Sequence, residues 1–565
     1  MADVDSTAAP WRPQPPLSRV AVARLVQLAG AYNIIGVLMP SPHGRLGELA
    51  AWIPTSGVLT ARAASAASGL LLIYLGAGLR RGKHRAWQVA VVLAGAGVVL
   101  HLARGWHYDA AGVSAALLVM LIIVRHRFHT RADPWNRWRA LIALLGFGGA
   151  GFVIGLAEIA LRATRLEGRP GLLDQVREAG LGLVGLTGPL RFTRPVAAEQ
   201  VSYTTGAFGL LAIGVAVVLL LRPANRLPQR TRADDDTLRQ LLHRHGESDS
   251  LGYFALRPDK SLFWTPSRRA VIAYRVINGV SLASGDPIGP ASEWPQVIAA
   301  WLRDCAEHGW TPAVLGCGAA GGKAFRKAGL DVVELGDEAI LDVATFSVQG
   351  RALRGVRQAV GRVERAGFHC QVARLRDLPA EAVAEAKRSA DAFRDGKVER
   401  GFSMALSRIG DPRDGDCLFV ICRDAGGQIR GLLQFVPWGA HGLSLDLMRG
   451  DRTAENGLTE FMVVSTVNAA REMGGRRISL NFAVLRSIFA RADELGAGPF
   501  LRLTHRLLTT ASKLWQIESL YRSNAKYQPT WSPRYLCFPV VRDLPRIAVA
   551  ALSAEAFLPR LGWRR

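Results

Sequence analysis

The sequence predicts a two-part protein: a bundle of membrane-spanning helices, followed by a soluble α/β region in which one order of elements occurs twice. At 565 residues the chain is too long for one compact domain, and its long apolar stretches fall before residue 222. The composition then shifts to a segment rich in Pro, Arg and Asp. We therefore expect a transmembrane domain over residues 1–222, a linker over 223–240 and a soluble region from residue 241.

About six apolar stretches are long enough to cross a bilayer. Positive charge is concentrated in the loop from Arg80 to Arg85 and in residues 125–139, whereas the loop at 104–109 has little, so both chain ends are expected in the cytoplasm. Residues 163–204 then form a long external loop, whose apolar part is compatible with a re-entrant segment. The expected spans lie near residues 20–40, 63–79, 86–103, 110–124, 140–161 and 205–221.

These features predict a multi-pass protein of the cell membrane with its soluble region on the cytoplasmic side. The net charge of +24 is shared by both parts of the chain and favours phosphate-rich partners, meaning anionic lipid, nucleic acid or both. The six cysteines all lie in the second half without paired metal-ligand spacing, which indicates reduced thiols. We expect no metal and no other cofactor.

Two successive passes of strands and helices are expected in the soluble region. Each pass has antiparallel strands, then a helix, then a further strand, an order typical of acyltransferase-type α/β folds. We therefore predict two tandem acetyltransferase-like (GNAT) folds, over 241–350 and 351–565, with the catalytic site in the second. The first pass has strands at 261–264, 270–277, 280–285, 311–316 and 331–336, with helices near 291–309 and 321–329. The second has strands at 417–422, 431–438, 443–448 and 476–482, with a helix at 458–473.

Two glycine motifs in the first pass are weak indications of nucleotide binding. Gly316–Gly321 fits the pattern GxGxxG, but a lone match without a ribose-binding acid has little weight. The following Gly322-Lys323 resembles the end of a P-loop, yet its spacing is one residue too long and Ala324 replaces the Ser or Thr that would hold Mg²⁺. ATP binding is therefore not predicted.

An amphipathic helix with a cationic face is expected near the start of the second pass. Its arginines fall on one side at 100° per residue, and Leu353, Val356, Val360 and Val363 cover the other. It is either a solvated surface helix packed on a core or a docking site for tRNA phosphates or the inner leaflet. The arginines are Arg351, Arg354, Arg357, Arg362 and Arg365.

The strand at 443–448 carries an acidic residue at its centre. Alternation along a strand places Ser444, Asp446 and Met448 on one face and Leu445 and Leu447 on the other. Burying a carboxylate is costly, so Asp446 either pairs with an internal arginine or receives a cationic ligand. Both alternatives are open.

The loop after this strand argues against acetyl-CoA as the acyl donor. Acetyltransferases use a glycine-rich loop here to hold pyrophosphate with backbone N–H groups. Residues 449–457, RGDRTAENG, lack the RxxGxG/A spacing and contain Asp451 and Glu455, which would repel pyrophosphate.

Several motifs, in order, resemble the lysylphosphatidylglycerol synthase (multiple peptide resistance factor) family over about residues 240–545. They are ASGDPIGP, GDEAILDV, GFSMAL, SLDLMR followed by NG, SLNFA and LYRSNAKYQPTWSPRY. The resemblance is to the actinobacterial type, without its fused lysyl-tRNA synthetase, so we expect a separate synthetase to supply the aminoacyl-tRNA.

The resemblance implies that an aminoacyl group, expected to be lysyl, moves from tRNA to the glycerol hydroxyl of phosphatidylglycerol. Such a reaction modifies membrane charge and resistance to cationic peptides. Six spans are too few for the family's flippase domain, so synthesis without flipping is predicted. Transfer to another lipid or to a cell-wall acceptor is the alternative enzyme function. A non-catalytic lipid transporter or scaffold is a further alternative.

The resemblance also implies site residues, to which roles can be assigned. Asp446 and Glu460 are expected to hold a cationic amino acid, and Arg449, Lys526 and Arg534 are expected to meet phosphates. Asp446, Arg449, Lys526 and Glu460 are the predicted catalytic set. The remaining predicted substrate-binding residues are Ser444, Asn456, Ser479, Asn481 and Tyr521. Structural alternatives stay open: Asn456 could cap the next helix, Ser479 and Asn481 could be satisfied strand residues, and Trp531, Pro533 and Tyr535 are expected in the core or in turns.

Overall fold

The structure is a computed structural model, and it divides into two compact units. A helical unit includes Gln14–Asn225, and an α/β unit includes Arg226–Cys305 and Thr311–Arg565. Tyr521 and residues 223–229 of the predicted linker lie outside the described residues. The structure describes residues 17–38, 55–80, 82–103, 108–125, 128, 135–168, 170–186, 188–193, 195–220, 230–394, 396, 401–484 and 522–558.

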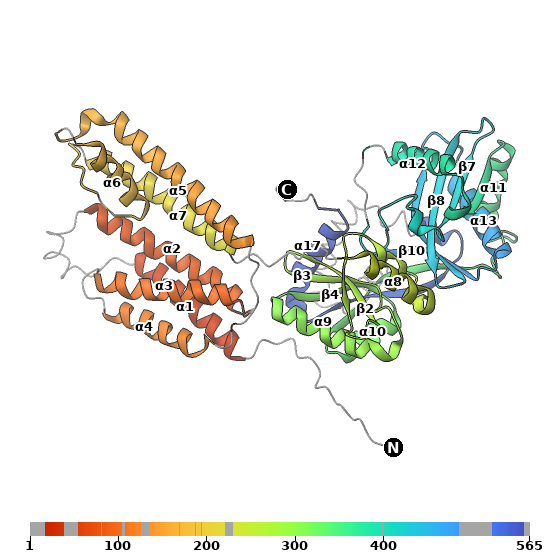
Figure 1. The fold of residues 1–565 in the computed structure, drawn as a ribbon, viewed down its shortest axis with the longest axis horizontal. Helices are drawn as coiled ribbons and strands as arrows, with labels where there is room; N and C mark the ends of the chain where they lie inside the picture. The colour runs from red at the N-terminus through yellow and green to blue at the C-terminus, as the bar shows by residue number, and fades with distance from the viewer. Residues whose placement is uncertain are drawn as a thin grey trace, which may run out of the picture. The chain divides into compact units, whose positions relative to one another are not determined.

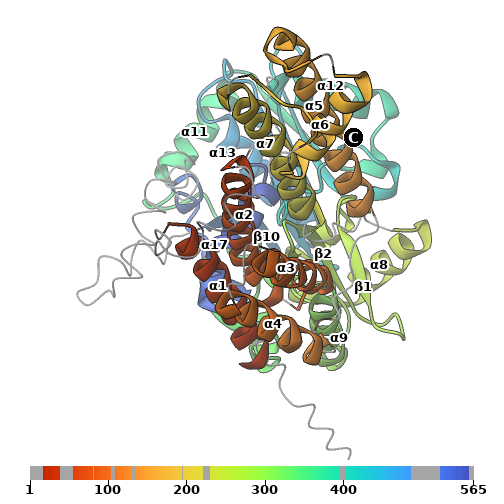
Figure 2. The same cartoon turned by 90° about the vertical axis from the view of Figure 1, so that its left-hand side faces the viewer.

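Each predicted span overlaps a helix of the helical unit (Figures 1 and 2). Helix α1 packs along α2, α3 along α4, and α5 along α7. The structure also shows a short helix, α6, within the predicted external loop, and α7 begins at Pro195, ten residues before the predicted span. The helices are α1 (Leu17–Leu38), α2 (Thr55–Arg80), α3 (His84–Ala103), α4 (Tyr108–Ile123), α5 (Trp135–Leu161), α6 (Leu172–Leu183) and α7 (Pro195–Leu220).

Two helices in the described part of the chain are long and apolar enough to cross a membrane. They are Arg137–Leu161 in α5 and Val196–Leu220 in α7, and shorter apolar helices occupy Ser68–Arg80 and Ala111–Ile123. Large apolar side chains on these helices are exposed, including Ile142 at 67% and Leu145 at 65%. Such contiguous apolar surface is typical of contact with lipid.

The α/β unit begins within the predicted linker. Helix α8 (Arg232–His245) is capped by Thr231, whose hydroxyl oxygen accepts a hydrogen bond from Asp234 N while the Asp234 carboxylate accepts one from Thr231 N. This reciprocal capping box, followed by buried Leu238, Leu241 and Leu242, explains why the chain becomes helical here.

The described strands form one eleven-stranded sheet in the order β1-β2-β3-β4-β11-β5-β10-β9-β8-β7-β6. The predicted strands and helices are present within three residues of their expected ends, except that β5 continues to Asp342, beyond the predicted end at residue 336. Elements that were not predicted are α8, β6, β11, α12 and α17. The strands are β1 (Ser261–Trp264), β2 (Val271–Ile277), β3 (Val280–Ser284), β4 (Thr311–Cys317), β5 (Asp331–Asp342), β6 (His369–Arg374), β7 (Leu418–Arg423), β8 (Ile429–Trp438), β9 (Gly442–Gly450), β10 (Arg477–Val484) and β11 (Thr530–Phe538). The helices are α9 (Trp294–His308), α10 (Ala319–Lys327), α11 (Arg354–Arg365), α12 (Ala380–Arg394), α13 (Leu458–Glu472) and α17 (Leu544–Ala554).

The same order of elements occurs twice in this sheet, as the sequence predicted. In the first half, antiparallel β1, β2 and β3 are followed by α9 and by β4, which runs parallel to β3. In the second half, antiparallel β6, β7, β8 and β9 are followed by α13 and by β10, which runs parallel to β9. The boundary at residue 350 stays a prediction.

Strand β11 comes from the C-terminal end of the chain yet lies between β4 and β5. Pro533 obscured it in the sequence, because proline cannot donate to a ladder. The structure accommodates Pro533 because β11 pairs with β4 only through Tyr535, Leu536 and Cys537, which leaves the proline opposite β5 alone.

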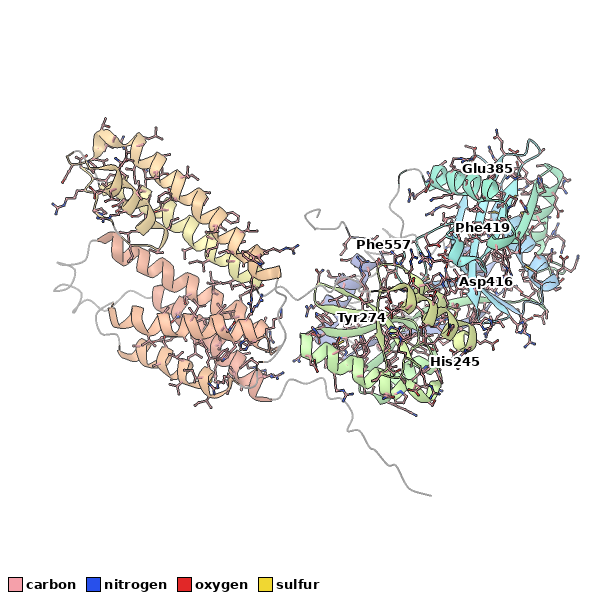
Figure 3. The ribbon with its side chains drawn as sticks, in the orientation of Figure 1. His245, Tyr274, Glu385, Asp416, Phe419 and Phe557 are labelled. Carbon is pink, nitrogen blue, oxygen red and sulfur yellow. The ribbon has the colours of Figure 1, made fainter. Side chains whose placement is uncertain are left out.

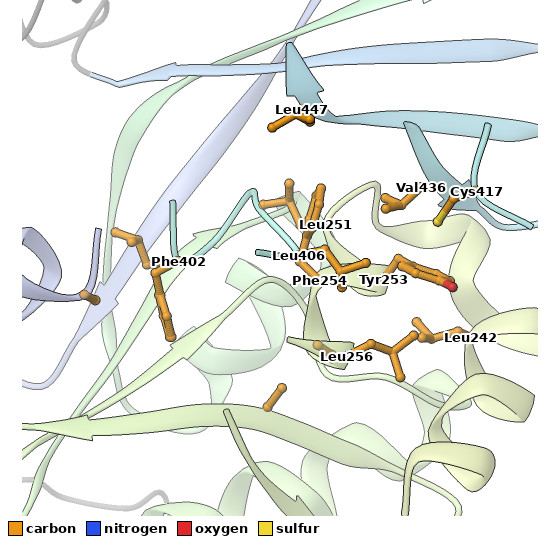
Figure 4. Packing of buried hydrophobic residues seen from close by; sticks show 14 of the residues in the cluster. Leu242, Leu251, Tyr253, Phe254, Leu256, Phe402, Leu406, Cys417, Val436 and Leu447 are labelled. Carbon is orange, nitrogen blue, oxygen red and sulfur yellow. The ribbon is translucent and has the colours of Figure 1, made fainter. Parts of the chain in front are cut away.

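Two hydrophobic clusters cover opposite faces of the second half of the sheet. Helix α12, which carries the Glu385 labelled in Figure 3, packs through Ala386 and Ala390 into one cluster. This cluster continues into the first half of the sheet, where Leu251 and Phe254 belong to it (Figure 4). Helices α11 and α13 pack into the other cluster, through residues such as Val360 and Val467. The buried valines of α11 confirm the predicted amphipathic helix.

Candidate active site

Strand β9 contains a bulge at Asp446. Gln434 of β8 pairs with Leu447 and Phe435 pairs with Leu445, so Asp446 is an extra residue in the ladder. The prediction that Leu445 and Leu447 share a face is therefore wrong. Leu445 packs in the cluster under α13, and Leu447 packs in the cluster under α12 (Figure 4).

Strands β9 and β10 separate immediately beyond Ser444 and Ser479. Their parallel pairing covers only three residue pairs, which end at Ser479 and Ser444. Strand β10 then has a bulge of its own, in which Asn481 has a φ of 68°. The Asn481 side-chain amide donates to Leu445 O across the opening at 2.6 Å. The two bulges thus create a polar gap in the middle of the sheet.

The Asp446 carboxylate is oriented by two neutral donors. Leu406 N donates to its Oδ1 at 2.7 Å, and Gln434 Nε2 donates to its Oδ2 at 2.7 Å. These two hydrogen bonds fix the direction of the carboxylate. They also connect β9 to residues 401–409, a segment that sequence reasoning did not place at the site. The GFSMAL motif, which falls in that segment, was the only available signal for it.

Unpaired polar atoms gather around Asp446. Among the residues that the structure describes, Ser444 Oγ, Gln434 Oε1 and Asn481 Oδ1 are buried and accept or donate no hydrogen bond. These residues lie on the neighbouring strands β8, β9 and β10. A buried unpaired polar group costs about 1–3 kcal/mol, so three of them together indicate a place where bound water or substrate is accommodated.

Lys526 and Glu460 form an ion pair over the second cluster. Lys526 Nζ donates to Glu460 Oε1 at 2.6 Å, and Glu460 lies in the first turn of α13. The side chains are 30% and 19% exposed, so water still reaches both. Tyr527 lies beneath them, and burial raises the pKa of its hydroxyl above the usual range.

Arg534 and Ser479 belong to a separate buried network. The guanidinium of Arg534 donates to Glu338, Asp249, Ser250 Oγ and Gly316 O, and these contacts use all of its nitrogens. Ser479 Oγ donates to the same Glu338. Arg534 therefore has no free nitrogen for the phosphate that we expected it to meet, and Ser479 is a satisfied strand residue.

The glycine motif of the first half surrounds an internal carboxylate. Gly318 N donates to Asp286 Oδ1 at 2.7 Å at the start of α10, and a Cβ added to Gly321 would lie 2.1 Å from the same oxygen. Burial, followed by the nearby Asp249 charge, raises the pKa of Asp286 to about 7. Because Gly318 and Gly321 have no Cβ, the Asp286 carboxylate can lie at the N-terminus of α10, a position where an external phosphate would otherwise bind.

Asn456 and Arg449 are two further predicted site residues whose surroundings the structure describes. Gly457, with a φ of 108°, is the N-cap of α13 and no side chain caps the helix, so the capping role considered for Asn456 is wrong. The backbone carbonyl of Asn456 instead accepts a hydrogen bond from Arg362. Arg449 lies at the end of β9 and lines a cavity against α12.

The arginines of α11 divide into two groups. Arg357 donates to Val348 O and Gly350 O, and Arg362 donates to Asn456 O, so these two stabilise neighbouring backbone. Arg354 and Arg365 of α11, and Arg351 just before it, are exposed, and Arg362 is exposed in addition to its contact. The cationic surface therefore includes these four side chains.

Comparison with known proteins gives consistent matches for the α/β unit. The family described as "Phosphatidylglycerol lysyltransferase, C-terminal" matches residues 239–538. The chain is 44% identical over 465 residues to the "Lysylphosphatidylglycerol biosynthesis bifunctional protein LysX" of Rhodococcus opacus (strain B4), which covers 80% of this chain and 41% of the relative. The LysX of Mycobacterium avium (strain 104) is 40% identical over 561 residues, which is 97% of this chain and 47% of the relative.

The chain thus spans less than half the length of these curated relatives. Among solved structures, "The structure of L-PGS from Bacillus licheniformis" has a TM-score of 0.52 and 21% identity, and covers 59% of this chain and 99% of that chain. This likeness shows that the α/β unit has the same fold.

Proposed function

Because the chain belongs to the phosphatidylglycerol lysyltransferase family, as the motifs suggested, we propose that it transfers a lysyl group from lysyl-tRNA to the glycerol hydroxyl of phosphatidylglycerol. The single observation that carries the proposal is the family match. It covers more than half of the chain and includes both strands that separate at Asp446.

The proposed reaction exchanges one ester for another. The lipid hydroxyl oxygen attacks the lysyl ester carbonyl, a new C–O bond forms, and the bond to the tRNA ribose breaks while the hydroxyl proton passes to the ribose oxygen. Such an exchange needs positioning, proton transfer and stabilisation of an oxyanion, and it requires no ATP. The product lipid gains positive charge, which would weaken binding of cationic peptides to the membrane.

The polar gap between β9 and β10 suits this chemistry. We assign Asp446 to the ammonium groups of the lysyl substrate, since Leu406 N and Gln434 Nε2 orient its carboxylate beside the gap. The unpaired Ser444 Oγ and Asn481 Oδ1 are placed to orient the ester or the acceptor hydroxyl. Lys526 is held by Glu460 and can donate its remaining N–H groups to a phosphate or an oxyanion.

We also propose the arrangement of the whole chain. The helical unit would cross the membrane about six times with both ends in the cytoplasm, and the α/β unit would consist of two tandem acetyltransferase-like folds at the inner leaflet. Arg354 and Arg365 of α11, with Arg351 just before the helix, would attract tRNA phosphates or anionic lipid.

The experiment uses the full chain in vesicles that contain phosphatidylglycerol, with preformed lysyl-tRNA and no ATP. We expect lysylphosphatidylglycerol, identified by mass spectrometry, together with an equal amount of deacylated tRNA. Lysine found only on a different lipid would replace the proposed acceptor. If lysyl-tRNA is consumed no faster than in vesicles without protein, the proposed activity is excluded.

A further inference from the structure

A cavity of about 280 Å³ opens between α12, residues 407–409 and the end of β9. It lies on the α12 face of the sheet, beside Leu447, which directly follows the bulge at Asp446. Its charged and hydroxyl lining residues are Lys387, Asp391, Arg394, Ser407, Arg408 and Arg449. Four cations and one carboxylate thus surround a small space.

The charges of these cations are not equally available. The guanidinium of Arg408 is occupied, because its three nitrogens donate to Asp414 and to Leu256 O. Arg394 has one distant contact with Asp391, at 3.4 Å, and its Nε is buried without a partner in the described part of the chain. Lys387 and Arg449, which also line the cavity, form no ion pair with another residue that the structure describes. The cavity therefore retains an excess of positive charge.

The wall of the cavity is fixed by the same contacts that orient Asp446. The Asp446 carboxylate holds Leu406 N, and Gln434 Nε2 donates to Arg408 O at 3.3 Å, so both ends of Ser407 are anchored. Ser407 itself has a φ of 58°, a strained conformation for a residue other than glycine. Such strain is maintained only where the surrounding structure enforces it, which is typical of functional sites.

The size and lining of the cavity favour a small phosphodiester over RNA. Pockets for small ligands begin at about 300 Å³, so this cavity has room for one headgroup. Single-stranded RNA is usually bound by stacking its bases on aromatic side chains. The apolar residues of this lining are Ala390, Ile409 and Leu447, none of which is aromatic.

We propose that this cavity binds the phosphodiester of the acceptor lipid's headgroup, through Lys387, Arg394 and Arg449, and so brings its terminal glycerol toward the gap beside Asp446. The inference rests on the proposed function and assigns that site its lipid subsite. It adds two residues of α12, Lys387 and Arg394, to which the sequence gave no role.

The test is the combined substitution Lys387→Gln and Arg394→Gln in the full chain. Transfer is measured in neutral micelles at varied phosphatidylglycerol and fixed lysyl-tRNA, with oleate keeping the surface charge constant. We expect the KM for phosphatidylglycerol to rise by about tenfold or more, since charged hydrogen bonds are lost, while kcat and the KM for lysyl-tRNA stay unchanged. Arg388→Gln, an exposed neighbour on α12 outside the cavity, is the matched control and should change the KM less than about twofold.

Soluble glycerophosphoglycerol should inhibit the unmodified protein and lose most of its effect on the double variant. Equal inhibition by inorganic phosphate would show that the cavity takes free phosphate and would overturn the lipid assignment. A raised KM for lysyl-tRNA would assign the cavity to RNA, and an unchanged KM for lipid would also overturn the inference. If the unmodified chain makes no lysylated lipid, the proposed function fails. Calorimetric binding of glycerophosphoglycerol then tests the cavity separately, and absence of binding overturns it.

Discussion

Each half of the sheet has one pair of parallel strands joined by a helix, β3 and β4 through α9, and β9 and β10 through α13. The two pairs differ in the length of their pairing and in the polar groups beside them. In the first half, β3 and β4 pair over five residues, from Val280 to Ser284, and Asp286 occupies the N-terminus of the helix that follows. In the second half, β9 and β10 pair over three residues and then separate around Asp446 and Asn481. At the first junction, which we call closed, Gly318 N donates to the Asp286 carboxylate, and the other oxygen of that carboxylate is buried without a partner among the described residues. At the second, which we call open, the buried atoms without a described partner are Ser444 Oγ, Gln434 Oε1 and Asn481 Oδ1.

From this difference we infer that the first half of the sheet contributes mainly to stability and the second half mainly to the proposed transfer. The buried network of Arg534, Glu338 and Asp249 reaches the closed junction through Asp286 N, which donates to Asp249, and its charged groups are paired with one another. In the second half of the sheet, the Lys526–Glu460 pair at the start of α13 is partly exposed. We therefore expect substitutions in the first set to affect folding and substitutions in the second to affect transfer.

The largest effect on stability is expected for Arg534→Met. It leaves Glu338 and Asp249 buried without their cation, and breaking a buried pair in this way costs about 3–5 kcal/mol. Thermal unfolding of the α/β unit should shift strongly downward. Arg546→Met, whose guanidinium contacts Asn278 O at the surface, is the control and should shift far less. Equal shifts would remove the distinction between the junctions.

A much smaller effect on stability is expected for Lys526→Met and Glu460→Gln. Both side chains are partly exposed, so their pair contributes about 0–1 kcal/mol, while loss of transfer should exceed about tenfold. A double-mutant cycle on unfolding measures the first quantity and vesicle assays measure the second. Variants that unfold readily yet retain transfer would place this pair with the structural network.

A pH dependence of stability is expected at the closed junction. Burial raises the pKa of Asp286 to about 7 from an ordinary value of 3.8, so the folded protein keeps a proton that the unfolded chain has released. The stabilisation is complete below about pH 4 and is lost as the pH rises to about 7. Asp286→Asn should remove this decline when unfolding free energies are compared at pH 5 and pH 8. Parallel curves for the two proteins would show that Asp286 does not titrate in this range.

Periodicity in the sequence predicted most of the elements, because regular strands and amphipathic helices leave a local pattern. It failed at β11, where Pro533 hides a strand whose partners are distant in the chain. It also failed at β9, since a bulge depends on the facing strand, and the alternation of Leu445 and Leu447 was read as continuous. The family motifs suggested Asp446, Glu460 and Lys526 as site residues, and their roles stay predictions. Only the tertiary structure reveals that the Arg534 guanidinium pairs with the internal carboxylates of Glu338 and Asp249.

The most direct test of the functional assignment compares one acidic residue from each junction. Full-length Asp446→Asn and Asp286→Asn proteins, matched for folding, are assayed for lysylphosphatidylglycerol formation in vesicles with lysyl-tRNA. Asparagine at 446 can still accept from Leu406 N but lacks the charge, so transfer should fall by roughly a hundredfold, whereas Asp286→Asn should retain transfer within about threefold. Retained transfer in Asp446→Asn together with its loss in Asp286→Asn would contradict the assignment of the active site to the open junction.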